Sequence, residues 1–453
     1  MLVLVGFASC RISKPYQQPE FETSKLYRDA EGTDTSSMAS VHWKKLFADT
    51  ILTGLIAEGL NQNIDMKIAL QRINAAGANF RQSKAAFLPD LNGTASVTQS
   101  KLSFPQGFGI ISSSTQYDMG LRATWEADIW GKLKSAKRGA LATLLQSEAA
   151  RRAVQTQLIA DISGRYFTLL ALDQQLQVLE QTVNNRKTDV RTMKALKAAN
   201  VVTGAAEVQS EASQYAAEVA IPRLQKQIRE TENSLNVLLA RPSSAVRRSS
   251  LNEQRLLTDL KTGIPVQLLQ NRPDVKQAEY AFMAAFEATN VARKLFYPSI
   301  TLTANGGFTS FSLKDWLTPD GLFGNIAAGI AQPIFNKGAN KARLATAQAA
   351  QQEAALNFQQ SLLKAGEEVS NALFAYQTAE RQQEIRVKQL AALEKSVDFT
   401  KKLLRYSSAT NYTDVLTSEQ NLLAAQMEDI DDKLQQWQAV IALYRSLGGG
   451  SEK

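Results

Sequence analysis

The stretch "DVKQAEYAFMAAFEATNVARKLFYPSITLTA", residues 274–304, matches an earlier stretch of equal length, "DMKIALQRINAAGANFRQSKAAFLPDLNGTA", residues 65–95. At a constant shift of 209 positions, both stretches place an aromatic residue and a proline in the same register, with Pro89 falling on Pro298. In each copy, apolar residues recur every three or four positions before the proline and every two positions after it. Because proline cannot continue a helix, we expect each copy to change there from helix to strand.

Four segments show the alternation of a strand: "LNGTASVTQ" (91–99), "YDMGLRATWEADI" (117–129), "SITLTANGGF" (299–308) and "LFGNIAAGIAQPIF" (322–335). The second is the clearest, with Leu121 and Trp125 on its apolar face and Arg122 on its polar face. Strands of this length and alternation are typical of membrane barrels, whereas a strand of a soluble sandwich usually has about five or six residues. We therefore predict two hairpins of barrel strands.

Four strands are too few to close a barrel in a membrane, because known barrels have about eight or more. An open sheet edge is not tolerated in lipid. If these strands lie in a bilayer, several chains must share one barrel, and three chains would supply twelve strands.

A long helical tract follows each hairpin, at 133–199 and at 339–405, and neither tract contains proline. Each tract then reverses into a returning helix, at 205–240 and at 413–447, and Pro222 is expected to kink the first of these. Small residues on the helix faces allow close packing along a long seam, with polar residues toward water. An ordinary coiled coil is the alternative, but it would require leucine-rich heptads, which are weak here.

The chain begins "MLVLVGFASCRISKP", a short apolar run and small residues before Cys10. This order is typical of a bacterial lipoprotein signal, in which the cysteine becomes the acylated first residue, carrying palmitate or a similar chain. The alternative is an incidental cysteine in a frayed terminus. We expect a signal remnant (1–9), an extended arm (10–50), a first repeat (51–250) and a second repeat of the same plan (251–450).

The composition includes few of the residues that most often carry catalysis. The chain has one histidine, His42, and one cysteine, and the residues around His42 indicate neither a zinc site nor a nucleophilic triad. The net charge of +8 is spread along the helical tracts, with no basic module interleaved with aromatics. We therefore expect no enzyme, no cofactor, no metal site and no nucleic-acid partner.

Several motifs, taken together, make the chain resemble a known family. They are "LLQNRPDVKQAE", "ARKLFYPSITL", "WEADIWGKLKSA", "AQPIFNKG" and the ending "ALYRSLGGG". Nearly the whole chain resembles the outer-membrane factor family, the TolC-like channels of tripartite efflux systems, and especially their OprM/NodT-like lipoprotein branch.

The resemblance implies a mainly α protein with β strands, assembled as a homotrimer. Three chains would share a twelve-stranded barrel in the outer membrane and a long helical tunnel in the periplasm. The partners implied are a periplasmic adaptor protein and an inner-membrane pump of the RND type. The function implied is a passive exit duct for drugs, metal ions or other small molecules.

Family members close the tunnel where the second long helix reverses, often with a ring of carboxylates and with arginine and tyrosine nearby. In "RYSSATNYTDVLTSEQ" these last two match Arg405 and Tyr406. The usual acidic position carries Thr417, which leaves Asp414 and Glu419 as candidates for the gate. For Asp414, the structural alternative is a residue favoured by the helix dipole at a helix start.

Gly204 and Glu207, near the first reversal, are candidates for adaptor contact on position alone, with ordinary helix-turn chemistry as the alternative. Two other functions stay open. One is the exit channel of a type I protein-secretion system. The other is a soluble coiled-coil scaffold, which would leave the long strands and the lipoprotein-like start unexplained.

Overall fold

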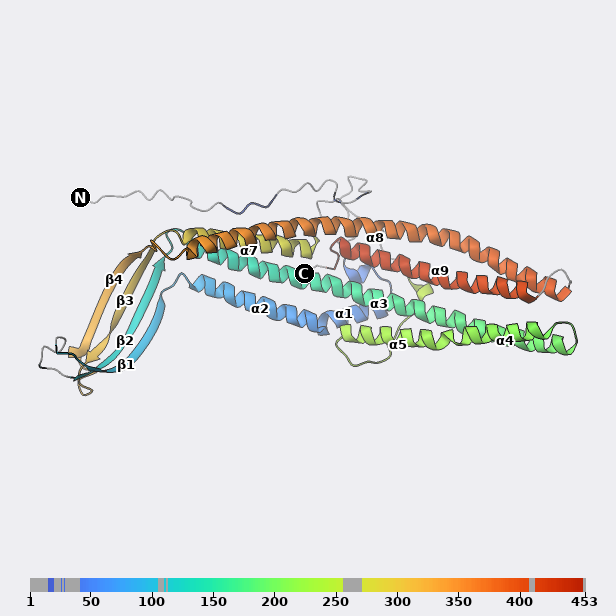
Figure 1. The fold of residues 1–453 in the computed structure, drawn as a ribbon, viewed down its shortest axis with the longest axis horizontal. Helices are drawn as coiled ribbons and strands as arrows, with labels where there is room; N and C mark the ends of the chain where they lie inside the picture. The colour runs from blue at the N-terminus through green and yellow to red at the C-terminus, as the bar shows by residue number, and fades with distance from the viewer. Residues whose placement is uncertain are drawn as a thin grey trace. The chain divides into compact units, whose positions relative to one another are not determined.

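The computed structural model describes residues 15–19, 26, 28, 41–104, 110, 113–255, 271–406 and 412–450. Most of them are helical, as Figure 1 shows. The helices are α1 (Thr50–Gln62), α2 (Ile64–Ala85), α3 (Lys132–Ala198), α4 (Gly204–Glu218), α5 (Ala220–Leu238), α7 (Pro273–Lys294), α8 (Ala339–Tyr406) and α9 (Tyr412–Ser446), with short 3-10 helices at Trp43–Lys45, Leu251–Glu253 and Pro319–Gly321. The prediction of a mainly α protein with β strands is confirmed.

The chain divides into two compact units, and each takes segments from both halves of the sequence. The first unit comprises Met1–Glu20, Arg72–Ser147 and Gln277–Phe358, and holds the strands of the described residues. The second comprises Phe21–Gln71, Glu148–Lys276 and Gln359–Lys453, and holds both helical reversals.

The strands β1 (Asp90–Lys101), β2 (Ser113–Ala127), β3 (Ser299–Ser310) and β4 (Leu322–Ala331) form one antiparallel sheet in the order β1-β2-β3-β4. The two predicted hairpins are confirmed. Pairing of β2 with β3 joins the hairpins into a single sheet, which the sequence pattern did not predict. Because β2 and β3 have neighbours on both sides, β1 and β4 are the two edges of the sheet.

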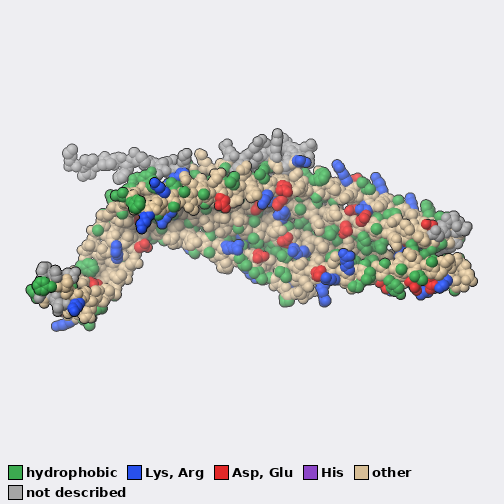
Figure 2. Space-filling model, viewed as in Figure 1, with side chains coloured by type: hydrophobic (Ala, Val, Ile, Leu, Met, Phe, Trp, Pro, Cys, Tyr) green, Lys and Arg blue, Asp and Glu red, His purple; other side chains and the backbone are tan. Residues whose placement is uncertain are grey.

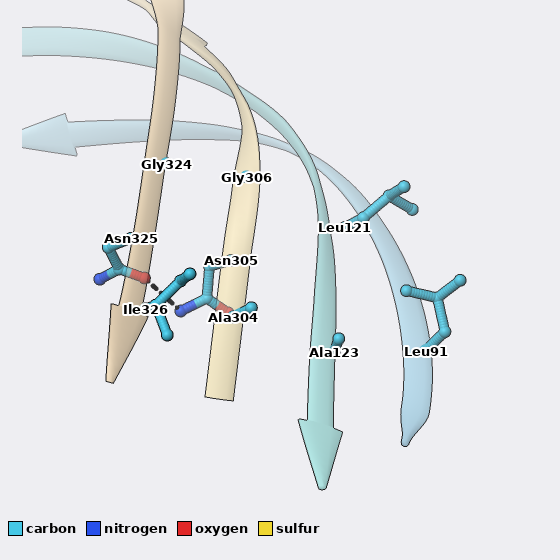
Figure 3. A pocket seen from close by; sticks show the side chains of 9 residues that line it. All are labelled: Leu91, Leu121, Ala123, Ala304, Asn305, Gly306, Gly324, Asn325 and Ile326. Carbon is cyan, nitrogen blue, oxygen red and sulfur yellow. Dashed lines mark hydrogen bonds between the residues drawn. The ribbon is translucent and has the colours of Figure 1, made fainter. Parts of the chain in front are cut away.

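One face of this sheet is apolar and uncovered. Leu91 is 68 % exposed, Ile326 77 % and Ile330 74 %. Figure 3 shows a shallow hollow on the sheet, lined by Leu91, Leu121, Ala123, Ala304, Asn305, Gly306, Gly324, Asn325 and Ile326. Large apolar side chains left uncovered in this way mark a surface that another apolar phase or another chain covers.

The passages from helix to strand occur at the two prolines found in the repeat, Pro89 and Pro298. Two tryptophans fix the backbone there. The indole of Trp125 donates to the carbonyl of Phe87 at 2.9 Å, and the indole of Trp130 donates to the carbonyl of Pro298 at 2.7 Å. Both bonds satisfy carbonyl groups that the helix and the strand leave unpaired.

A buried polar cluster joins the start of α3 to α7 within the first unit. Arg138 donates to both carboxylate oxygens of Glu287, at 2.5 and 2.8 Å, and Glu287 is 1 % exposed. Lys294 donates to the hydroxyl of Ser135 at 2.7 Å and to the carbonyl of Gly131 at 2.8 Å. Each buried charge therefore has partners, as burial requires.

The helices α3 and α8 contain 67 and 68 residues. At about 1.5 Å per residue, each spans roughly 100 Å along its own axis. Gly366, inside α8, lies directly under the backbone of Leu26, and a Cβ atom there would collide with the carbonyl of Leu26. Leu26 therefore packs against α8 at a residue without a side chain, where two backbones can approach closely.

Two helical segments are interrupted. The segment before the first proline breaks at Asn63, between α1 and α2, and the Asn63 side chain accepts from the amide of Met66 at 3.1 Å and donates to the carbonyl of Leu238 at 2.9 Å. The first returning helix breaks between α4 and α5 at Val219, three residues before Pro222. The proline ring clashes with the carbonyl four positions earlier, so the disturbance precedes the proline itself.

The core of the second unit is aromatic. Phe167 stacks on Trp437 with centroids 4.4 Å apart, and both Phe167 and Tyr166 are fully buried. The hydroxyl of Tyr166 donates to Asp49 at 2.6 Å, and Asp49 caps α1 by accepting from the amide of Ile51 at 2.8 Å. This arrangement gives a buried phenol the partner that it needs.

On the face drawn in Figure 2, basic and acidic side chains are interspersed along the helices rather than gathered into one patch. This matches the prediction that the net charge of +8 is distributed. Within the described ranges, no helix carries an apolar segment long enough to cross a bilayer.

Candidate functional site at the helical reversals

The first reversal joins α3 to α4 through an asparagine. Asn200 has φ of 57°, and the amide of Val201 donates to the carbonyl of Leu196 at 2.9 Å. This is a Schellman ending, in which asparagine takes the left-handed position that glycine usually occupies. Gly204 opens α4 two residues after Val202 and has an ordinary negative φ.

The second reversal joins α8 to α9, and residues 407–411 lie outside the described residues. Tyr412, the first residue of α9, is 6 % exposed. Its hydroxyl donates to the hydroxyl of Ser210 on α4 at 2.8 Å, and Ser210 is fully buried. This bond ties the start of the second returning helix to the first returning helix.

An apolar cluster surrounds this bond. Met193 of α3 packs with Tyr412, Val415 and Leu416 of α9, all of them buried. Partly buried residues from α3, α4, α8 and the first turn complete it: Leu196, Val202, Ala206 and Leu404. The two reversals therefore share one small core in the second unit.

A charged cluster lies next to this core along α3. The guanidinium of Arg186, 4 % exposed, forms an ion pair with the carboxylate of Glu419 on α9 at 2.6 Å. Lys401 of α8 reaches the same carboxylate at 2.6 Å. Glu419 is only 11 % exposed, so one carboxylate holds three helices together in surroundings that strengthen electrostatic attraction.

Asp189 faces the same cluster and is poorly compensated. Burial first, and then the carboxylate of Glu419, raise the pKa of Asp189 from 3.8 to about 6, while Lys401 and Arg186 act in the opposite direction. The Oδ2 atom of Asp189 is buried and has no hydrogen-bond partner among the described residues. Asp189 is therefore the weakly held member of the cluster.

Three ion pairs spaced along the helices join α3 to α4 at the first reversal and form a ladder. Three lysines of α3 meet three glutamates of α4: Lys187–Glu218 at 3.2 Å, Lys194–Glu211 at 2.8 Å and Lys197–Glu207 at 2.5 Å. The three lysines are about half exposed, so solvent screens each pair and its contribution to stability is small. The ladder aligns the two helices more than it stabilises them.

The structure separates the residues predicted for the gate. Asp414 lies exposed in the first turn of α9, whereas Glu419 is largely buried and forms ion pairs with the buried Arg186 and the half-exposed Lys401. Tyr406 ends α8 and is 78 % exposed. Arg405 precedes it in the same helix, and its side chain lies outside the described part of the chain.

The structure describes two of the three other predicted site residues, Gly204 and Glu207. Gly204 is exposed, and a Cβ atom there would meet Lys197 at an ordinary distance of 3.8 Å. Glu207 is held by Lys197, and its side chain is 17 % exposed. Cys10 lies outside the described residues.

Sequence reasoning missed Arg186, Asp189 and Ser210. All three belong to uninterrupted helical stretches, and only the packing of α3 and α4 against α9 brings them to Glu419 and Tyr412. Only Lys401 could have been noticed in the sequence as a repeated position. It lies 207 positions after Lys194, close to the shift of 209 that relates the two copies near their prolines. Each of these lysines pairs with a glutamate of the returning helix.

Comparison with known proteins shows one family over most of the chain. The family described as "Outer membrane efflux protein" matches residues 55–241 and 264–449. The cation efflux system protein CusC of Escherichia coli is 28 % identical over 456 residues, covering 99 % of this chain and 97 % of that protein. The toluene efflux pump outer membrane protein TtgC of Pseudomonas putida is 28 % identical, covering 97 % and 93 %.

Solved structures share the fold. A membrane protein from Pseudomonas aeruginosa superposes with a TM-score of 0.90 at 25 % identity, covering 97 % of this chain and all of that one. A crystal structure of CusC superposes with a TM-score of 0.87 at 27 % identity, covering 97 % and 99 %. The structural similarity therefore covers both compact units, the one that holds the strands and the one that holds the helical reversals.

The raised pKa of Asp189 predicts a dependence of stability on pH. Between about pH 4 and pH 6, the folded chain keeps a proton on Asp189 that the unfolded chain releases, so stability falls as pH rises through this window. Asp189→Asn removes the ionisation. We expect the variant to unfold a few degrees higher than the parent at pH 8 and at about the same temperature at pH 4, as followed by circular dichroism.

Asp398→Asn is the matched control, because Asp398 lies on α8 with its side chain 52 % exposed. Its unfolding temperature should differ little from that of the parent at both values of pH. A clear loss of stability for Asp189→Asn at pH 8 would contradict the prediction, since it would mean that attraction to Arg186 outweighs burial.

Proposed function

The chain belongs to the outer membrane efflux protein family, and we propose that it is the outer-membrane exit duct of a tripartite efflux pump. The observation that carries this proposal is the four-stranded sheet with two unpaired edges and one uncovered apolar face. An apolar face suits contact with lipid, and a polar opposite face suits a water-filled lumen.

The duct is a homotrimer. Backbone N–H and C=O groups along β1 and β4 need partners, because lipid supplies none. Pairing β4 of one copy with β1 of the next satisfies both edges, and three copies close a barrel of twelve strands. A contact of this head-to-tail kind closes into a ring when the rotation between copies allows it.

The helical reversals form the closed periplasmic end of the duct. Three-fold symmetry places three copies of Asp414 around one axis, where like charges at close range would attract cations. Arg405 and Tyr406 belong to the same end of α8 and contribute to holding it shut. Glu419, bound to Arg186 and Lys401, acts as a tie between helices rather than as a charge exposed to the lumen.

A periplasmic adaptor docks at the first reversal. Gly204 leaves the start of α4 uncovered, and Glu207 with Lys197 presents a paired charge beside it. A partner helix with complementary charges could exchange ion pairs with this ladder, since its members are partly solvated. An inner-membrane pump of the RND type supplies the energy, and this chain offers a passive path.

Cargo is chosen mainly at the pump. The names of the two relatives already compared mention cation efflux and toluene efflux, which differ widely in chemistry on one fold. We propose a duct for drugs, metal ions or other small molecules, because a wide passive channel discriminates less than a binding pocket does.

The trimer is tested by solution mass. In detergent, we expect a complex of three chains that resists dissociation until heated, because separating the copies exposes the edges of β1 and β4. Light scattering with detergent subtraction, before and after heating, measures it. Monomers with intact helices and full strand content would contradict the shared barrel.

The role of Asp414 is tested by conductance in planar bilayers. Asp414→Ala removes three negative charges per trimer from the proposed gate, so we expect a lower preference for cations by severalfold. Asp398→Ala removes the same charge from an exposed position higher on α8 and serves as the control. Equal selectivity in both variants and the parent would exclude Asp414 from the gate.

Lipidation at Cys10 anchors the mature chain in the outer membrane. An acylated cysteine contributes about 0.8 kcal/mol for each buried CH₂ group, so several chains hold a protein firmly. Metabolic labelling with palmitate should mark the parent and leave Cys10→Ser unlabelled. Label on the serine variant would show that the acyl group resides elsewhere.

A further inference from the structure

One row of side chains crosses the polar face of the whole sheet. Asn92 of β1 lies opposite Arg122 of β2, Arg122 lies opposite Asn305 of β3, and Asn305 lies opposite Asn325 of β4. Figure 3 shows the two asparagines of β3 and β4 joined by a hydrogen bond, in which Nδ2 of Asn305 donates to Oδ1 of Asn325 at 2.9 Å. The row thus combines one cation with three amides.

On β2 and β3, the residues in the two neighbouring rows of this face have short side chains or none, so they leave space around the row. On one side of it, Gly120 lies opposite Gly307, and a Cβ atom at Gly307 would collide with the backbone of β2. On the other side, Thr124 lies opposite Thr303, so the side chains there are short. Arg122 is therefore exposed, with small neighbours on β2 and β3.

Three acidic residues share this face: Asp118 and Glu126 have partners there, and Asp90 of β1 lies opposite Thr124, one row from Arg122. Asp118 accepts hydrogen bonds from Gln116 at 3.0 Å and from Thr309 at 2.7 Å. Glu126 forms an ion pair with Lys132 at 2.6 Å. Among the ion pairs of the described residues, none involves Arg122. Its charge is therefore directed to the solvent.

We propose that Arg122 and the asparagine row form an anion-attracting ring inside the barrel. The inference rests on the trimeric duct proposed above, in which the polar face lines the lumen. Symmetry then sets three Arg122 side chains at one level. With strands about 4.8 Å apart and tilted by about 40°, a twelve-stranded barrel has a radius of roughly 12 Å. Long side chains pointing inward from that wall approach each other to on the order of one Debye length, ~10 Å at 0.1 M salt.

The chemistry fits solutes that carry a carboxylate, sulfonate or phosphate group. A guanidinium presents paired N–H donors that match such groups, and the asparagine amides add neutral donors beside it. The ring stands in water, so attraction is weak enough for a solute to leave, as conduction requires. It favours anionic solutes at this level of the duct while the proposed Asp414 ring favours cations at the other.

The local potential is measured with a thiol placed on the row. Asn305→Cys is modified with two methanethiosulfonate reagents of similar size, one anionic and one cationic, on the intact trimer in detergent. We expect Arg122→Gln to lower the ratio of the anionic to the cationic rate by roughly three- to tenfold, and Arg122→Lys to leave it nearly unchanged. The trimer without Asn305→Cys gives the background.

Lys101→Gln is the matched control, because Lys101 has the same charge and lies on the opposite face of the sheet, at the end of β1. It should leave the ratio unchanged. Should Arg122→Gln fail to assemble, the parent ratio is followed from about 0.05 M to about 1 M salt, where screening should bring it close to that of a neutral site. If the ratio of the anionic to the cationic rate depends on neither Arg122 nor salt, the proposed ring is wrong.

A second thiol separates failure of this inference from failure of the duct. Ile326→Cys lies on the apolar face, next to Asn325 (Figure 3). In lipid vesicles, the water-soluble reagents should modify Asn305→Cys and spare Ile326→Cys. The reverse pattern would overturn the assignment of the two faces, and with it the proposed duct. Modification of Asn305→Cys alone, with no influence of Arg122, would overturn only the ring.

Discussion

The unpaired backbone at the edges of β1 and β4 is the constraint on which the rest of this protein depends. Four strands with one apolar face can neither close on themselves nor remain open in lipid. The answer is symmetry, because a copy of the same chain supplies the missing edge. Long helices and a passive lumen are then properties of a ring of chains.

The helical reversals show a different arrangement, in which a small core and several ion pairs hold long helices together. The core that the two reversals share, around Met193 and Tyr412, is small. The lysines of the ion pairs between α3 and α4 are about half exposed. The firmest tie joins Arg186 to Glu419, whose side chains are 4 % and 11 % exposed, while the half-exposed Lys401 reaches the same carboxylate. Removing one partner of the Arg186–Glu419 pair would leave an uncompensated buried charge, which is strongly destabilising.

The two ends of the proposed duct carry opposite charges. Asp414 is exposed at the second reversal, and Arg122 is exposed on the polar face of the sheet. Both side chains are exposed, so in the proposed duct each would act on passing solutes through its electrostatic field. A path with weak sites of both signs suits varied cargo, whose chemistry is then selected by partners that bind it more closely.

Local pattern was enough to predict the strands with their two faces, the long helices and the two proline stops, because each depends on neighbours a few positions away. Pairing of β2 with β3, the contact of Arg186 with Glu419 and the bond from Tyr412 to Ser210 join residues far apart in the chain. Such contacts follow from how whole elements pack, and periodicity carries no information about them. Pro222 is a local effect that the sequence did show: its ring meets the carbonyl of Glu218, four positions earlier, and the helix breaks directly after that residue, at Val219.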